Sequence, residues 1–303
     1  MRFHVDGSLV DSEAATLPVD DRGVTFGDAV SEPVRVAGGH PVAWSAHLDR
    51  LLDACDALGL DPPDAADLRK RVEETVAANR IEEALVRLTV TRGRNGSDDG
   101  EDADHGAGSL PGVARLRPPT DPDPTVVVTV DAVSADPDPV RLGTVRTRAI
   151  SPAAVPAAAA THNRLDAVLA GAELRRAAPP DGRPADEALL RGADGHVVGG
   201  SASDPMFVAD DALRLPVLDD HAPRTATRSL VRDIARAEEL PVVEGAYAPA
   251  DFRDADEAFV AEPAAGVRPV GSIDGVDVGG GPVTRLLAHL YDERVVGDAE
   301  RGV

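Results

Sequence analysis

The stretch DDRGVTFGDAVSEPVRV, residues 20–36, decides how the first half of the chain folds. It opens on the turn-forming residues 20–23, and its last residues, 34–36, fit a strand. Two glycines, Gly38 and Gly39, and a second strand-like run follow directly. The sequence therefore predicts a hairpin at this point.

Periodic patterns extend from this stretch in both directions. In the alternating run at the N-terminus, Asp6 and Gly7 predict another hairpin. From Ser45 onward, apolar residues recur at spacings of three and four, which predicts a helix. Further helices are expected over residues 64–79, 163–177, 226–238 and 283–293, and strands over 81–91, 125–130, 145–150, 187–191, 196–199, 205–209, 241–244 and 257–260. Short strands interleaved with few helices are typical of an α+β fold.

The length and one proline-rich segment divide the chain into domains. A chain of 303 residues corresponds to about two domains of roughly 100–200 residues each. Aspartate and proline alternate over residues 136–139, a composition typical of a linker. We expect a smaller N-terminal α+β domain over 1–133, a linker over 134–144 and a larger C-terminal α+β domain over 145–303.

The charge balance is strongly acidic and excludes two classes of partner. The chain has 53 acidic and 31 basic residues, a net charge of −22, and only one of its bases is a lysine, Lys70. Such a charge repels nucleic acids and anionic lipid surfaces, so we expect neither nucleic-acid nor membrane binding. An acidic surface with few lysines is typical of halophilic proteins, in which salt screens the repulsion.

Cysteine content and hydropathy predict a soluble, cytoplasmic protein. The single cysteine, Cys55, allows neither an intrachain disulfide nor a cysteine metal cluster, and its helical position predicts a core residue. The N-terminus lacks the apolar segment of a signal peptide, and no apolar run is long enough to span a membrane. The Gly/Asp-rich tract 93–111 lacks the spacing of a calcium loop, so we expect a solvated loop and no metal site.

Three segments together resemble the motifs of the class IV aminotransferases, which are fold-type IV pyridoxal 5′-phosphate enzymes. Residues 21–36 are similar to D-R-G-F-x-Y-G-D-G-x-F-E-T-x-R-V, and residues 47–51, HLDRL, match H-x-x-R-L. Residues 160–170 are similar to K-T-x-N-Y-L-x-x-V-L-A, and residues 186–208 to D-E-A-L-x-x-x-x-G-x-x-x-E-G-x-x-S-N-x-F-x-V. The resemblance covers nearly the whole chain and implies the two-domain fold-type IV architecture, pyridoxal phosphate as cofactor, and a dimer.

At the positions where the family has its cofactor-binding residues, this sequence has other residue types. The family's Schiff-base lysine aligns with Ala160, its ring carboxylate with Gly199, its ring-hydroxyl tyrosine with Arg164 and its phosphate-contacting T-G-T with residues 261–263. Because a Schiff base needs an amine, the loss at Ala160 argues against covalent cofactor binding. Lys70 falls in a helix of the first half and offers no replacement.

Part of the implied phosphate site survives. Arg50 matches the phosphate-contacting arginine, Asn163 matches the asparagine of the lysine motif, and a helix start at Thr225, Ala226 and Thr227 offers N–H groups to an anion. Two alternatives stay open. The threonines could be plain N-caps, and Arg50 could pair with an acidic neighbour.

Two functions follow from this pattern. The first is a catalytically degenerate class IV homologue that binds a small anionic metabolite, or that acts as a subunit in a homodimer or in a heterodimer with an active paralogue. The alternative is an active pyridoxal-phosphate aminotransferase or lyase, on amino-acid or aminodeoxychorismate-type substrates, with His162 as a rebuilt general base. His162 could equally be a packing residue. Hydrolysis through Ser201 or Ser203 with a histidine is disfavoured, because no G-x-S-x-G motif is present.

Overall fold

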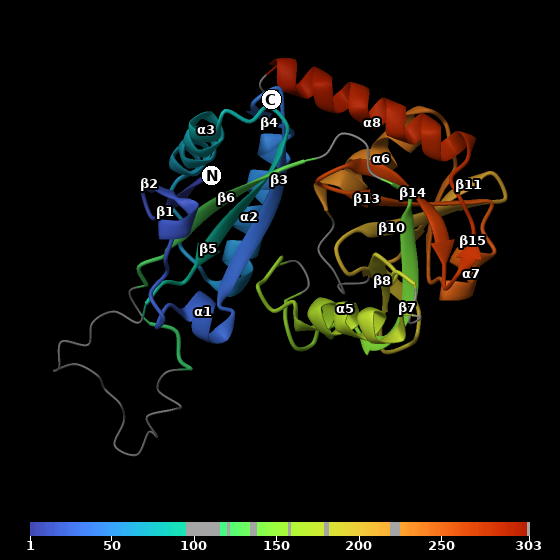
Figure 1. Ribbon diagram of the computed structural model, residues 1–303, viewed down its shortest axis with the longest axis horizontal. Helices are drawn as coiled ribbons and strands as arrows, with labels where there is room; N and C mark the ends of the chain where they lie inside the picture. Colours follow the sequence, from blue (N-terminus) through green and yellow to red (C-terminus); the bar gives the residue numbers. More distant parts are fainter. Residues whose placement is uncertain are drawn as a thin grey trace.

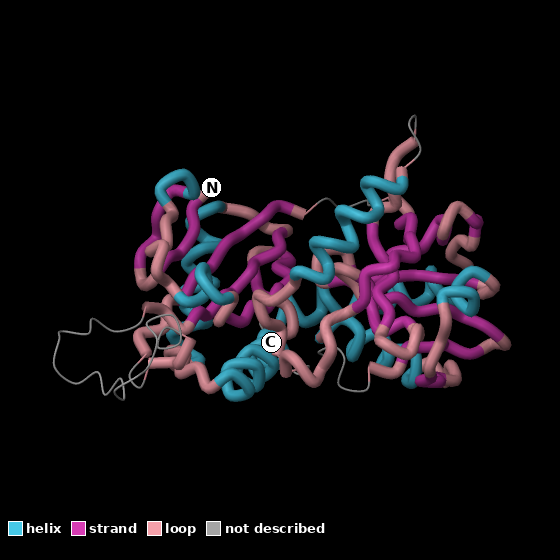
Figure 2. The backbone as a smooth tube through the Cα atoms, turned by 90° about the horizontal axis from the view of Figure 1, so that it is seen from below, coloured by secondary structure: helices cyan, strands magenta, loops and turns pink. Residues whose placement is uncertain are grey.

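The computed structural model describes residues 1–94, 116–119, 122–133, 138–156, 159–178, 182–218 and 225–301. Within these ranges the chain forms two halves, each built on its own β-sheet (Figure 1). Figure 2, turned by 90°, shows the same two halves side by side. Most of the tract 93–111 and residues 134–137 of the predicted linker lie outside the described residues.

The N-terminal half is an antiparallel sheet covered by two helices. Its strands follow the order β2-β1-β6-β5-β3-β4, and α2 and α3 pack against them. Valine and leucine side chains from the strands and both helices form one core cluster, which includes Cys55 as predicted. The elements are β1 Arg2–Val5, β2 Ser8–Asp11, η1 Ser12–Ala14, α1 Arg22–Phe26, β3 Ala29–Ala37, β4 His40–Pro41, α2 Trp44–Leu58, α3 Ala65–Asn79, β5 Ala84–Thr91 and β6 Val126–Ala132.

Both predicted hairpins of this half are confirmed. Asp6 and Gly7 have φ of 45° and 85°, so two residues with positive φ join β1 to β2. Gly38 and Gly39, also at positive φ, turn β3 into β4. The strand predicted after this second turn is shorter than expected, because helix α2 begins at Trp44.

The C-terminal half is a larger mixed sheet with helices on its surfaces. The strand order is β12-β11-β10-β13-β14-β7-β8-β9, with β15 paired to β14. Helix α5 packs on β7 and β8, whereas α6 and α8 pack near β13 and β14. The elements are β7 Val140–Arg148, α5 Leu165–Ala177, β8 Glu187–Arg191, β9 Val197–Gly200, β10 Asp204–Ala209, β11 Ala212–Pro216, α6 Ala226–Ala237, β12 Val242–Gly245, α7 Pro249–Arg253, β13 Glu257–Glu262, β14 Gly266–Ile273, β15 Val276–Asp277 and α8 Pro282–Arg301.

The boundary between the halves needs one correction. The predicted linker includes residues 140–144, yet these form the first part of β7, which pairs in parallel with β14 and β8. Val140 and Leu142 are both 2% exposed, so this segment already carries the alternating burial of a strand. The predicted final helix 283–293 is likewise longer in the structure, because α8 continues to Arg301.

A short ladder of hydrogen bonds joins the two halves next to Ala160. The edge of β3 forms an antiparallel bridge between Val30 and Thr161. The Ser31 N–H donates to the Ala160 carbonyl at 2.9 Å, and the His162 N–H donates to the Ala29 carbonyl at 3.0 Å. The segment at the family's lysine position is therefore fixed to the N-terminal sheet.

Candidate functional site

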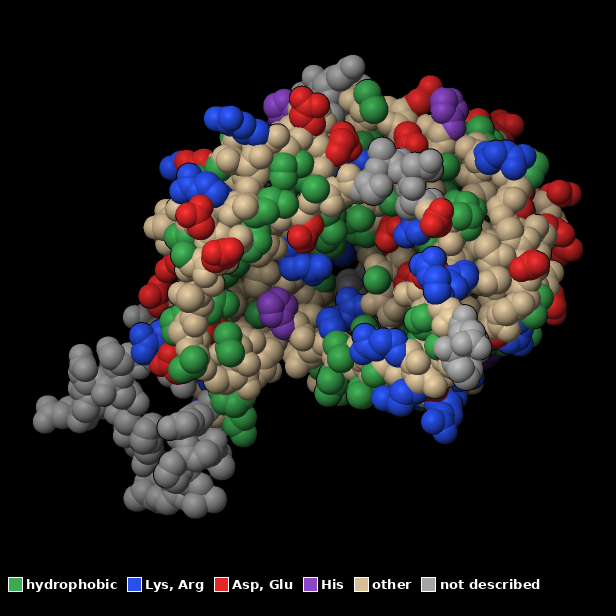
Figure 3. Space-filling model, viewed as in Figure 1, with side chains coloured by type: hydrophobic (Ala, Val, Ile, Leu, Met, Phe, Trp, Pro, Cys, Tyr) green, Lys and Arg blue, Asp and Glu red, His purple; other side chains and the backbone are tan. Residues whose placement is uncertain are grey.

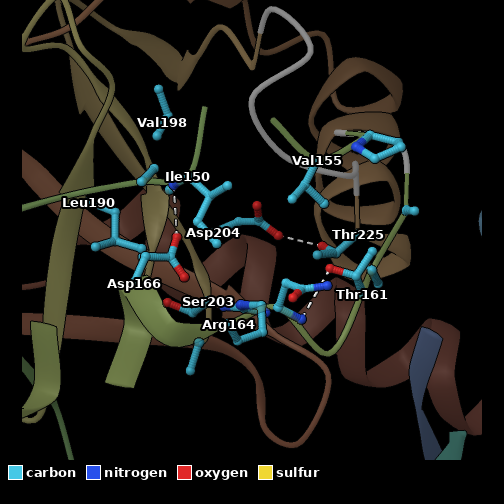
Figure 4. Close-up of a pocket in the computed structure, with 18 residues that line it drawn as sticks. Ile150, Val155, Thr161, Arg164, Asp166, Leu190, Val198, Ser203, Asp204 and Thr225 are labelled. Carbon is cyan, nitrogen blue, oxygen red and sulfur yellow. Dashed lines mark hydrogen bonds between the residues drawn. The ribbon is translucent and has the colours of Figure 1, made fainter. Parts of the chain in front are cut away.

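A pocket lies in the C-terminal half, between the end of β7, strands β8 and β9, the start of β10 and the beginning of α6 (Figure 4). Its cavity volume is about 150 Å³. A cavity of that size holds a ligand of about the size of benzene. Its apolar lining residues are Ala149, Ile150, Val155, Pro156, Ala159, Ala160, Leu190, Val198 and Ala202.

The pocket brings together six of the residues singled out from the sequence. They are Ala160, Asn163, Arg164, Gly199, Ser203 and Thr225. The others do not line it: Arg50 and His162 face other partners, and Ala226 and Thr227 lie in the first turn of α6. Thr227 is buried and shares a hydrogen bond with Tyr291.

The pocket wall carries a methyl group where the resemblance places a lysine. Ala160 lines the pocket, and its carbonyl accepts the Ser31 N–H. The chain's one lysine, Lys70, is 68% exposed on α3 in the other half, where its amine lies 3.9 Å from Glu74. The pocket therefore contains no lysine amine from this chain.

The space at Gly199 is empty, and the space at Gly200 is not. Among the described residues, no atom lies within 4 Å of a Cβ built on Gly199. A Cβ on Gly200 would collide with the carboxylate of Glu187 and lie 2.8 Å from the Ser203 carbonyl oxygen. Gly200 is therefore required by packing, whereas Gly199 leaves room.

Glu187 is a buried carboxylate that holds the turn between β9 and β10. Its Oε1 accepts the N–H groups of Ala202 and Ser203 at 2.7 and 2.8 Å, and its Oε2 accepts the Ser203 hydroxyl at 2.8 Å. Burial raises the pKa of Glu187 despite these donors. Because Ser203 is engaged by Glu187, it pairs with neither His162 nor His196, and no serine–histidine arrangement forms there.

Asp204 lies at the base of the pocket and is a functional candidate that the sequence reasoning missed. It is 5% exposed, and the Thr225 hydroxyl donates to its Oδ2 (Figure 4). Burial raises the pKa of Asp204, although the guanidinium groups of Arg228 and Arg50 act in the opposite direction. Thr225 itself is the N-cap of α6 and accepts the Arg228 N–H at 3.0 Å.

Arg50 is engaged by a carboxylate. Its Nε lies 3.1 Å from Oε1 of Glu32, and its Nη2 lies 3.4 Å from Oε2. His47 approaches the same carboxylate, with 2.6 Å between Nδ1 and Oε1. Of the two alternatives for Arg50, the structure therefore has the ion pair with an acidic neighbour.

His162 and Arg164 make contacts outside the base of the pocket. The His162 Nε2 shares a hydrogen bond of 2.6 Å with Ser31 Oγ, and burial together with Arg87 lowers the pKa of His162. Arg164 donates to the Ser201 carbonyl at 2.7 Å. The histidine considered as a general base therefore forms a hydrogen bond between the two halves.

Charged side chains of both signs cover the visible face of the molecule. Figure 3 shows a hollow between the two halves with basic and acidic side chains around it. In the described part of the chain, no helix is long and apolar enough to cross a membrane.

Comparison with known proteins gives one consistent family. The sequence profile described as "Amino-transferase class IV" matches residues 29–273. A putative branched-chain-amino-acid aminotransferase from Methanocaldococcus jannaschii is 29% identical over 301 residues, covering 97% of this chain and 96% of that protein.

Solved structures give the same result. The branched-chain aminotransferase from the thermophilic archaeon Thermoproteus uzoniensis, solved with norvaline, is 27% identical, with a TM-score of 0.82 and coverage of 100% of this chain and 97% of that one. The 4-amino-4-deoxychorismate lyase of Pseudomonas aeruginosa is 28% identical, with a TM-score of 0.76 and coverage of 96% and 98%. The fold predicted from the motifs is confirmed, and so is the pyridoxal-phosphate family that they resemble.

Proposed function

Since the chain belongs to the class IV aminotransferase family and yet has Ala160 in its pocket wall, we propose that it is a degenerate homologue that holds a small ligand without imine chemistry. The observation that carries this proposal is the methyl group of Ala160, because the only lysine of the chain is exposed on α3. A pocket of about 150 Å³ beside Ala160 supports the binding of a small ligand.

The pocket residues do not fit an imine-bound pyridoxal phosphate. When bound through a lysine, that cofactor supplies an electron sink, which needs an anion opposite its ring nitrogen. Ala160 provides no amine, and Gly199 provides no anion. At the start of α6, where N–H groups would receive a phosphate, Thr225 instead donates to the carboxylate of Asp204.

The anion site expected from the sequence is occupied by the protein's own carboxylates. Glu32 engages Arg50, and Asp204 engages Thr225. A free anionic metabolite would have to compete with both. The same homologue can serve as a subunit of a homodimer or of a heterodimer with an active paralogue, and exposed apolar side chains on α1 and α5 support this role.

Borohydride trapping tests the loss of imine chemistry. The protein is prepared as Lys70→Arg, so that no surface lysine can react, and is incubated with pyridoxal phosphate before reduction. Peptide mass mapping then separates any pocket adduct from modification of the N-terminal amine. We expect no pocket adduct in this background and a defined adduct at position 160 after Ala160→Lys.

Ala160→Arg is the matched control, because it adds length and charge without an amine that forms a stable imine. A reducible adduct at a pocket residue of the native sequence would contradict the proposal. So would transamination that requires added cofactor and disappears in His162→Ala, which is the outcome expected of the alternative, an active enzyme with a rebuilt site.

A further inference from the structure

The base of the pocket is acidic. Asp204 is only 5% exposed, and it lies at the first position of β10, facing Thr225 at the start of α6 (Figure 4). The hydroxyl of Thr225 satisfies Oδ2. A carboxylate in this position is costly to ionise unless a positive group approaches it.

The described cations that line the pocket or act on Asp204 have other partners. Arg164 lines the pocket and donates to the Ser201 carbonyl at 2.7 Å. Arg50 is bound by Glu32, and Arg228 donates to the Pro216 carbonyl at 2.6 Å in addition to its other contacts. Together these two arginines do not offset the burial of the carboxylate, since the pKa of Asp204 is still raised. The site thus favours an added positive charge over an added negative one.

The walls above Asp204 are apolar and contain unfilled space. Ile150, Val155, Leu190 and Val198 surround the pocket, and Figure 4 shows Ile150 and Val155 on either side of Asp204. The absence of a side chain at Gly199 leaves additional room. An apolar body of a few carbon atoms would lose its water against these walls.

We infer that the pocket binds a small primary amine with an apolar body, its ammonium group paired with Asp204. This inference rests on the proposed function, because a lysine side chain at position 160 would bring its own amine into the same space. A phosphate-bearing ligand is disfavoured, since its charge would meet the Asp204 carboxylate at the α6 terminus. The amine is held by a charge-assisted hydrogen bond and by burial of its chain.

A matched set of probes separates charge from apolar contact. Calorimetric titration of the native protein in KCl uses n-pentylamine, n-pentanol, pentanoate and inorganic phosphate. We expect n-pentylamine to bind at least tenfold more tightly than n-pentanol, which has the same chain without the charge, and pentanoate and phosphate to bind more weakly still. Equal affinity for amine and alcohol, or preference for either anion, would overturn the inference.

Two variants assign the charge to one residue. Asp204→Asn keeps the size of the side chain and an acceptor for Thr225. We expect it to weaken n-pentylamine binding at least tenfold, because the ammonium group loses a charge-assisted hydrogen bond. Asp210→Asn is the control, because Asp210 lies outside the pocket in the turn between β10 and β11, where its carboxylate accepts from Arg214 at 3.0 Å. We expect less than a twofold change there.

The test remains valid even if the Asp204→Asn variant does not fold. The affinities of n-pentylamine and n-pentanol for the native protein already show whether the charge of the ligand contributes to binding. If Asp204→Asn is folded and binds the amine as the native protein does, the assignment to Asp204 is wrong. Failure of the amine to bind, with no borohydride adduct, would remove this inference and leave the proposed function standing. A pocket adduct in the native sequence would remove the proposed function whatever the amine does.

Discussion

Ser31 and His162 are joined by a hydrogen bond of 2.6 Å between Oγ and Nε2 across 131 residues of sequence. Ser31 belongs to β3 of the N-terminal half, and His162 to the segment that carries Ala160. Thr89 on the neighbouring strand β5 completes the contact, with 2.8 Å between its hydroxyl and that of Ser31. The pocket wall is therefore held by side chains of the other half as well as by the backbone ladder.

Removing either partner of this hydrogen bond should cost stability and leave the pocket's ligand preference unchanged. We expect Ser31→Ala and His162→Ala each to lower the free energy of unfolding by about 1 kcal/mol, the usual net contribution of such a bond. The double variant should be less destabilised than the sum, as expected for residues in contact. Urea denaturation of the four proteins measures this coupling, and strict additivity would show that the bond is not formed in solution.

Acid should destabilise the fold through His4. His4 is 2% exposed in β1, and burial, followed by the charge of Arg71, lowers its pKa. The carboxylates of Glu74, 3.8 Å away, Asp67 and Asp6 act in the opposite direction. Because the folded state favours the neutral ring, its contribution is complete above the unfolded pKa of about 6.5 and is lost as the pH falls below it.

The comparison is with His4→Leu, which cannot take up a proton. Between pH 7.5 and pH 5.5 the native protein should lose up to about 1.4 kcal/mol more unfolding free energy than the variant. Urea midpoints at both pH values give the difference. An identical pH response of the two proteins would mean that His4 ionises as freely in the folded state as in the unfolded one.

Salt should stabilise the protein. A net charge of −22 destabilises the compact state by self-repulsion, and the screening length falls from about 10 Å at 0.1 M salt to about 3 Å at 1 M. We expect the urea midpoint to rise between 0.1 and 1 M KCl. Exposed ion pairs such as Arg94 with Asp20 weaken under the same conditions, so a falling midpoint would show that pairing outweighs repulsion.

The local parts of this structure could be predicted from the sequence. Asp6 with Gly7 and Gly38 with Gly39 fix their hairpins through the φ values that the turns require. Thr225 is the N-cap of α6, because its hydroxyl accepts the N–H of Arg228. The two residues are only three positions apart in the sequence, so this contact is local. The order of the motifs then identifies the family. Ala160 lies in the pocket wall of this chain.

The charges that shape the pocket could not be predicted, because their partners are distant in sequence. Glu187 meets Ser203 and Asp204 meets Thr225 only after strands β8 and β10 and helix α6 are in place. The sequence leaves two alternatives for Arg50, since Glu32 becomes its neighbour only when α2 packs on β3. The predicted linker also ends too late in the sequence, at residue 144, whereas β7 begins at Val140. The alternating Asp/Pro composition indicates a linker but does not indicate where the next strand begins.

The exposed apolar side chains of α1 and α5 should form a contact between two copies of the chain. Val24 and Phe26 on α1 are 56% and 39% exposed, and Leu165 and Val168 on α5 are 64% and 62% exposed. The two helices lie close together, because Asn163 just before α5 donates to the carbonyl of Gly27 at the end of α1 at 3.1 Å. Large apolar groups gathered in this way are typical of an interaction surface.

Light scattering coupled to gel filtration tests this surface. The native protein should elute as a particle of twice the 31.4 kDa chain mass, and Leu165→Glu combined with Val168→Glu should shift it to the mass of one chain, because two carboxylates would be buried unpaired in the contact. Val276→Glu, a substitution at a side chain 49% exposed on β15, is the control and should leave the mass unchanged. If the α5 variant keeps the native mass, the contact between copies lies elsewhere on the molecule.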